Sequence, residues 1–111
     1  MVSVPVSQLE KNYHDYQSGI FDVRKETEYL SEHVLNAKNT PLNKINAHLA
    51  EFPKDQKFYV HCAGGYRSMI ASSILKSRGY HNMIDVQGGY KAIKEADIPK
   101  SDFVCPTTLQ T

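Results

Sequence analysis

Cys62 and Arg67 enclose a short glycine-containing segment that has the clearest capacity for chemistry in the chain. An apolar run over residues 58–60 predicts a strand before this segment, and a helix is expected after it, from about Ser68 to Arg78. A strand, a tight loop and a helix direct backbone N–H groups toward one point at the positive end of the helix dipole. A thiolate is an anion, so this arrangement would favour the ionised, nucleophilic form of Cys62.

The residues between Cys62 and Arg67 fit the interpretation of Cys62 as a nucleophile. Gly64 and Gly65 can adopt backbone torsions that are closed to other residues, and they let a ligand approach the backbone. Arg67 supplies a permanent positive charge for a thiolate or an oxyanionic substrate. The alternative is that Cys62 is a buried, apolar residue at the end of a strand. The glycine pair, the arginine and the strand-loop-helix pattern occur together, and this favours the nucleophile.

Several neighbouring residues have two candidate roles. Ser68 can cap the helix or donate a hydrogen bond to the sulfur, and we favour the cap. Tyr66, at the outer part of the loop, is the side chain that we expect to meet an acceptor. His61 precedes the nucleophile, but neighbouring side chains of a strand point to opposite faces, so we expect it to face away. Cys105 is far from Cys62 in the sequence and forms no local redox motif with it, which argues against a resolving role.

Asp22 and Arg24 are a second candidate pair. We interpret them as a structural charge pair beneath the loop rather than as groups that take part in the chemistry. The five histidines show no metal-ligand spacing, and we expect no metal site.

The first half of the chain predicts alternating elements. Ser7 begins a capping box, so a helix is expected from there to about Tyr16. Residues 20–23 predict a buried strand, residues 25–30 a helical segment and residues 34–38 a weak strand. Thr40 as N-cap and Pro41 at the first helical position predict a further helix, which Pro53 ends.

The second half has the same alternation. Gly79 is expected at the C′ position of the helix that follows the loop. The inner face of that helix is assigned to five residues, Met69, Ile70, Ser73, Ile74 and Leu75. Residues 83–86 predict a strand, and Gly88 and Gly89 turn the chain into a last helix over residues 90–96. The alternation predicts an α/β fold with a mainly parallel sheet and helices on both faces.

Length and composition limit the function further. The 111 residues predict a single domain, with a core over about residues 6–99 and a polar, loosely held tail over residues 100–111. Thirteen basic and twelve acidic residues leave a formal charge of +1, which argues against nucleic acid or a membrane surface as a partner. Two cysteines are too few for a disulfide framework, and no signal peptide is recognisable. We therefore expect a cytoplasmic protein.

The sequence resembles the rhodanese family of sulfurtransferases over nearly its whole length. The active-site loop of that family begins with Cys, ends with Arg and has four residues between them, as residues 62–67 do. Three further segments match in order: Asp22-Val23-Arg24 with Glu28-Tyr29, His33-Val34-Leu35-Asn36-Ala37 with Asn39 and Pro41-Leu42, and Val86-Gln87-Gly88-Gly89-Tyr90.

The resemblance implies a five-stranded parallel sheet flanked by helices, with Cys62 at the carboxyl end of the central strand. Open α/β sheets bind their ligands at that end. It also implies a ping-pong reaction, in which Cys62 takes a sulfane sulfur from thiosulfate or a persulfide donor and passes it to a thiol or cyanide acceptor. No cofactor is implied. Related phosphatases and arsenate reductases have five residues between Cys and Arg, so four residues favour sulfur transfer.

The loop departs from the family in one respect. Rhodaneses that work well on thiosulfate often carry Lys or Arg within the loop, whereas Ala63, Gly64, Gly65 and Tyr66 are uncharged. We therefore expect a persulfide carried by glutathione or by a protein to be a better donor than thiosulfate. The loop also resembles those of rhodanese domains fused to metallo-β-lactamase-fold persulfide dioxygenases. Such a dioxygenase and a separate sulfur-accepting protein are both candidate partners.

Two other functions remain open. The domain could be a non-catalytic or sulfur-relay interaction module, in which persulfidated Cys62 serves only a partner protein. It could also be a redox sensor, because an exposed, reactive cysteine is oxidisable. A purely binding module has no physical need of the cysteine, so the intact loop favours the sulfurtransferase.

Overall fold

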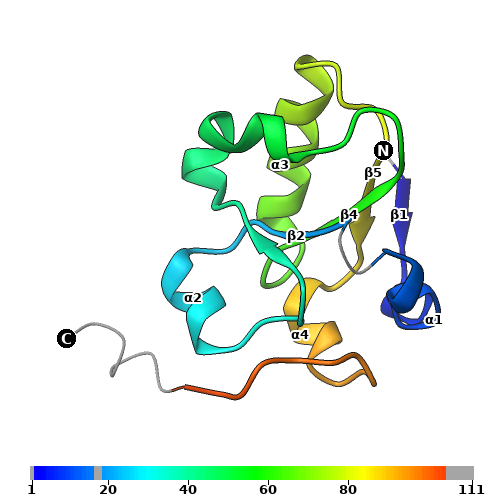
Figure 1. Ribbon diagram of the computed structural model, residues 1–111, viewed down its shortest axis with the longest axis vertical. Coiled ribbons are helices and arrows are strands. Elements are labelled where there is room, and N and C mark those ends of the chain that lie inside the picture. Colours follow the sequence, from blue (N-terminus) through cyan, green and yellow to red (C-terminus); the bar gives the residue numbers. More distant parts are fainter. Residues whose placement is uncertain (1, 17–18, 105–111) are drawn as a thin grey trace.

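A five-stranded parallel sheet runs through the protein in the order β1-β5-β4-β2-β3 (Figure 1). The computed structural model describes residues 2–16 and 19–104. The strands are β1 (Val2–Val4), β2 (Ile20–Asp22), β3 (Lys38–Asn39), β4 (Phe58–His61) and β5 (Met83–Val86). The α/β fold class is confirmed, and β4, which leads into the loop, is the central strand.

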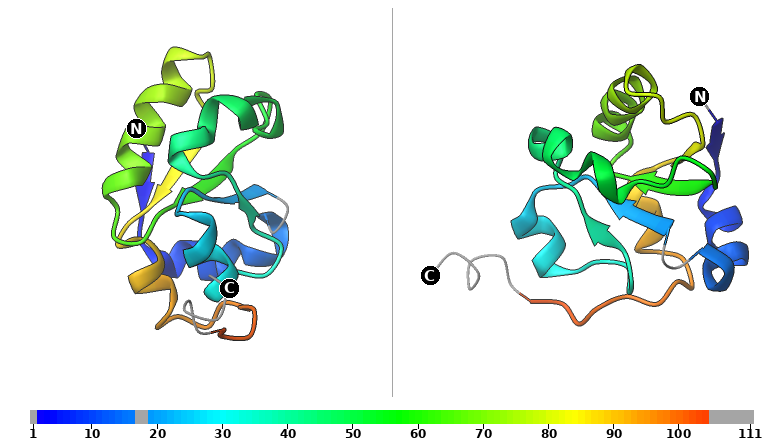
Figure 2. Two further views of the ribbon diagram at one scale, coloured as in Figure 1. Left: turned by 90° about the vertical axis from the view of Figure 1, so that its left-hand side faces the viewer. Right: turned by 45° about the horizontal axis from the view of Figure 1, so that its top comes forward.

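Helices cover both faces of this sheet (Figures 1 and 2). They are α1 (Val6–Tyr16), α2 (Glu26–Ser31), the 3₁₀ helix η2 (Leu42–Glu51), α3 (Tyr66–Ser77) and α4 (Gly89–Ile93). Strand β4 has a core on each side, because Tyr59 packs with residues of α1 and α4 while Phe58 and Val60 pack with residues of α3 and η2. Burial of both faces explains why the central strands are apolar without alternation.

In the first half one strand was missed and two expectations are wrong. Strand β1 was not expected, and two of its three residues are exposed. The strand expected over residues 34–38 is shifted to Lys38–Asn39, and Val34 makes only an isolated bridge with Lys100. Thr40 is not an N-cap, because its Oγ1 has no hydrogen-bond partner among the described residues. Its N–H donates to the Asp22 carbonyl at 2.9 Å and so extends the contact between β2 and β3. Pro41 takes the cap position instead.

The expected inner face of α3 is confirmed for Leu75, which is buried, and for Ile74, which packs against the core, but it is wrong for Met69, Ile70 and Ser73. Met69 is 56% exposed and Ile70 is 38% exposed, whereas the buried residues of this helix are Ser68, Ala71, Ser72 and Leu75. Small side chains let a helix approach the sheet closely, and this proximity outweighs the burial of larger side chains on the other face. The helix begins at Tyr66, inside the predicted loop, and Gly79 follows its C-cap as expected.

The chain after α4 is more firmly held than the composition suggests. Helix α4 ends at Ile93, earlier than expected. The Ser101 N–H donates to the His33 carbonyl at 2.8 Å, and the Val104 N–H donates to the Ser31 carbonyl at 2.7 Å. The first part of the polar tail is therefore bound beside α2, whereas Cys105 lies outside the described residues. Among the described helices, none has the length and apolar character needed to cross a membrane.

The first turn of α4 holds the chain just after β4. The Tyr90 N–H donates to the Cys62 carbonyl at 2.7 Å, and the Lys91 N–H donates to the Ala63 carbonyl at 3.0 Å. Gly89 has a φ of +55°, and a Cβ atom at this position would lie 2.4 Å from the Cys62 carbonyl oxygen. Glycine is therefore required both by the backbone conformation and by the close approach.

We expect Gly89→Ala to lower the free energy of unfolding by about 2 kcal/mol or more, because the added methyl group must displace backbone. Gly64→Ala is the control, since a Cβ atom there would have no neighbour within 4 Å. Urea unfolding of the two variants measures the difference. Equal stability of the two would show that α4 does not hold the loop so closely.

Candidate active site

The sulfur of Cys62 lies at the carboxyl end of the central strand, directly after β4. The residue is only 1% exposed. The Gly65 N–H donates a hydrogen bond to Sγ at 2.9 Å. Gly65 is the N-cap of α3 and has a φ of +105°, a left-handed conformation that favours glycine. The structure thus places a backbone donor, at the start of a helix, against the sulfur.

Ser68 contacts the sulfur from the first turn of α3. Its Oγ lies 3.6 Å from Cys62 Sγ and 2.5 Å from Oδ1 of Asp85, a buried residue of β5. The expected helix-capping role is wrong, because the cap residue is Gly65 and no side chain caps the helix. Sequence reasoning missed Asp85, although a carboxylate inside the apolar run 83–86 is an unusual feature that could have revealed it.

The short bond to Asp85 determines what Ser68 offers to the sulfur. A hydroxyl has one hydrogen, and a carboxylate at 2.5 Å accepts it in preference to the neutral Gly65 carbonyl at 3.2 Å. Ser68 Oγ therefore presents a lone pair to Cys62 and accepts the S–H of the neutral thiol. The Gly65 N–H favours the thiolate, whereas the Ser68–Asp85 pair and the negative charge of Asp85 favour the thiol.

We expect Asp85→Asn to increase the rate of alkylation of Cys62 by iodoacetamide near neutral pH, by roughly tenfold. The substitution removes a nearby negative charge and leaves the Ser68 hydroxyl able to donate to the sulfur. The measurement is the alkylation rate against pH, and the curve should shift toward lower pH.

Ser3→Ala is the matched control for this substitution. Ser3 Oγ donates to the other oxygen of Asp85 at 3.0 Å, so its removal leaves both the charge and the Ser68 contact in place. Its alkylation curve should stay close to that of the unmodified chain. An unchanged or slower reaction in Asp85→Asn would contradict the opposing effect of Asp85.

Arg67 is directed to a partner that the sequence did not predict for it. Its two terminal nitrogens donate to the Glu28 carboxylate at 2.7 and 3.1 Å. Through this pair Arg67 lowers the pKa of Glu28, and Glu28 raises the pKa of Arg67. Glu28 lies in one of the matched sequence segments, but nothing in the sequence pairs it with Arg67. The pair joins the end of the loop to α2.

Asp22 and Arg24 form the expected charge pair. The guanidinium donates from Nε to both oxygens of Asp22 at 3.0 Å, and Nη2 donates to Oδ2 at 2.8 Å. Nη2 also donates to the Glu32 carbonyl at 2.7 Å, and the guanidinium lies over the ring of Tyr90, 4.1 Å from its centroid. This buried pair connects the end of β2 with α2 and α4, and in this geometry it supports the fold around the loop.

His61 faces away from the sulfur, as expected. Its ring is buried 5.9 Å from that of Tyr90, and Nε2 lies 3.8 Å from Asp22 Oδ2 without a hydrogen-bond partner among the described residues. Burial lowers the pKa of His61, so the ring is neutral at neutral pH. At the loop itself, Tyr66 is 76% exposed, as expected for the outer residue, and Ala63 and Gly64 lie at the rim.

Comparison with known proteins identifies the family of this fold and loop. Residues 5–96 match the family described as "Rhodanese-like domain". A thiosulfate sulfurtransferase, GlpE, from Coxiella burnetii is 29% identical over 83 residues, which cover 75% of this chain and 77% of that protein. The adenylyltransferase and sulfurtransferase uba4 of Ogataea parapolymorpha is 38% identical over 87 residues, 78% of this chain and 22% of that protein.

The crystal structure of a rhodanese-like domain protein from Staphylococcus aureus has a TM-score of 0.80 with this chain. The two are 27% identical, and the match covers 95% of this chain and 100% of that one. The chain spans less than two thirds of the length of several curated relatives, 22% in the case of the Ogataea protein.

Proposed function

Because the chain belongs to the rhodanese-like domain family, we propose that it transfers a sulfane sulfur through a persulfide on Cys62. The observation that carries this proposal is the position of the sulfur, which lies after the central strand with the Gly65 N–H at 2.9 Å. The loop of four residues between Cys62 and Arg67 supports sulfur over phosphate as the transferred group. The sulfurtransferase names of two relatives agree with this class of reaction.

The reaction needs two displacements at sulfur. The Cys62 thiolate attacks the outer sulfur of a donor R–S–SH, and the S–S bond breaks with its electron pair on the inner sulfur, which leaves as R–S⁻. Cys62 then carries the outer sulfur as a persulfide. An acceptor thiolate attacks that sulfur, the bond to Cys62 breaks, and the Cys62 thiolate is restored. The Gly65 N–H stabilises negative charge on Cys62 Sγ before the first step and after the second.

Intact-mass spectrometry after incubation with a persulfide donor tests the intermediate. We expect a gain of one sulfur atom that a subsequent thiol removes, and that is lost in Cys62→Ser. Cys105→Ser is the matched control and should keep the gain. A persulfide that forms in Cys62→Ser and is absent from Cys105→Ser would overturn the assignment of the nucleophile.

The charge distribution of the loop also supports a preference for a persulfide donor over thiosulfate. Arg67, the one cation of the loop, is paired with Glu28, and this leaves little positive charge for the thiosulfate dianion. We expect kcat/KM for glutathione persulfide to exceed kcat/KM for thiosulfate by roughly tenfold or more, since one missing ion pair at a desolvated site costs over 1 kcal/mol. Steady-state rates with both donors and the same acceptor give the ratio, and a higher value for thiosulfate would contradict the preference.

One surface favours a second candidate function, the relay of sulfur to a partner protein. Tyr66, Met69 and Ile70 are exposed at positions i, i+3 and i+4 of α3, and therefore lie on one side of the helix next to the loop. Exposed apolar side chains that gather at one place are typical of protein contacts. A Cys62 persulfide that small thiols cannot discharge in the mass experiment would favour this relay over the small-molecule reaction.

A further inference from the structure

A groove with a volume of about 370 Å³ lies between the start of α2 and η2. Its floor is apolar and comes from Val23, Pro41 and Leu42, and Arg67, the last residue of the active-site loop, forms part of its wall. The groove therefore adjoins the loop, and its volume is in the range of sites for small molecules. Neither displacement described above uses it.

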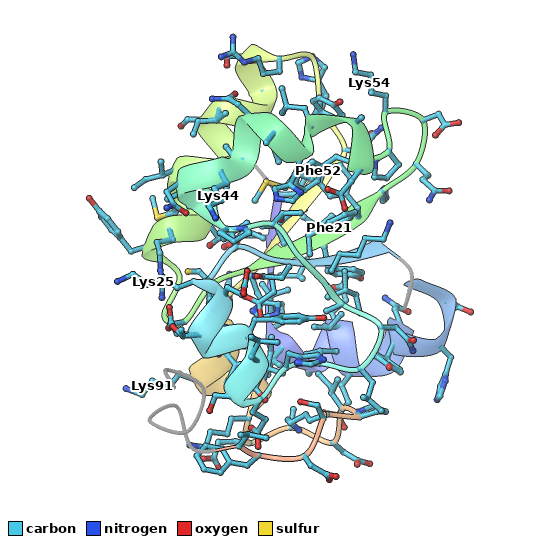
Figure 3. The ribbon with its side chains drawn as sticks, turned by 60° about the vertical axis from the view of Figure 1, so that its left-hand side comes forward. Phe21, Lys25, Lys44, Phe52, Lys54 and Lys91 are labelled. Carbon is cyan, nitrogen blue, oxygen red and sulfur yellow. The ribbon has the colours of Figure 1, made fainter. Side chains whose placement is uncertain are left out.

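The groove carries a particular set of charges. Lys25 and Glu26 stand at its α2 side and Lys44 at its η2 side, and all three residues are exposed. Figure 3 shows Lys25 beside α2 and Lys44 on η2, while Lys54 lies at a distance from both. The charge of Arg67 is balanced by Glu28 outside this set. The groove thus offers two cations, one anion and an apolar floor.

We propose that this groove binds the carrier part of a small peptide-like thiol that has two carboxylates and one ammonium group, the charge pattern of glutathione. Lys25 and Lys44 pair with the carboxylates, Glu26 pairs with the ammonium group, and the amide of Asn43 is available to the peptide bonds. The sulfur of the carrier then points past Arg67 toward Cys62. This role as a donor site rests on the proposed sulfur transfer, whereas binding of the carrier does not.

The same features argue against other occupants. Thiosulfate has no apolar part to cover the floor and no cation to pair with Glu26. A partner protein would contact the exposed side chains Tyr66, Met69 and Ile70, which do not line the groove. The alternation of charge across a small apolar surface matches a short zwitterionic peptide.

Calorimetric titration with S-methylglutathione tests binding without chemistry. We use the Cys62→Ser chain, so that no sulfur can be transferred. We expect saturable binding that weakens roughly tenfold in the Lys25→Ala, Lys44→Ala double variant, because two solvent-exposed ion pairs are lost together. Lys54→Ala, which removes an exposed lysine outside the groove, should bind as the parent does. Absence of binding, or equal binding by the double variant, would overturn the groove as the site.

Steady-state kinetics distinguish binding of the carrier in the groove from sulfur transfer by Cys62. The ratio of kcat/KM for glutathione persulfide to kcat/KM for the persulfide of 2-mercaptoethanol, whose carrier part has no charge, should fall roughly tenfold in the double variant. An unchanged ratio with intact sulfur transfer would refute the groove and leave the proposed function standing. If S-methylglutathione binds but no donor persulfidates the chain that keeps Cys62, the function is refuted and the groove stands.

Discussion

The backbone contact between α4 and the end of β4 is the interaction on which the site depends. The carbonyls of Cys62 and Ala63 accept hydrogen bonds from the N–H groups of Tyr90 and Lys91. Peptide units are planar and trans, so the N–H groups of the same units point away from α4. The chain that continues from there turns at Gly65, whose N–H reaches the sulfur. Without the close approach allowed by Gly89, the loop would lose the support that directs its donors.

Polar groups with opposing effects surround the sulfur of Cys62 in the loop that α4 supports. Gly65 favours a negative sulfur, whereas Asp85 holds the Ser68 hydroxyl in the orientation that accepts the thiol hydrogen. Arg67 would favour the anion, but its two hydrogen bonds go to Glu28. The groove that Arg67 helps to line carries two further cations, Lys25 and Lys44, and both are exposed.

The buried charge pair Asp22–Arg24 links α4, which supports the loop, to β2 and α2. Removal of either member would leave an unpaired charge in the interior, which is costly. Arg24 also contacts Tyr90, and Tyr90 donates to Glu32 at 2.6 Å, so β2, α2 and α4 meet at one cluster. Burial raises the pKa of Tyr90, which keeps its hydroxyl protonated as a donor. The active loop thus lies above a polar cluster that holds three elements together.

The sequence by itself determined the fold class, the strand that carries Cys62, the outward position of Tyr66 and the charge pair of Asp22 with Arg24. These follow from local periodicity, from glycine positions and from residue types at fixed spacing. It did not determine that α3 would bury Ser68 and Ala71 rather than Met69 and Ile70. Only the tertiary structure decided which residues surround the sulfur, since Asp85 and Glu28 reach the site from other elements. Such contacts depend on how helices approach the sheet, and neither spacing nor composition encodes that distance.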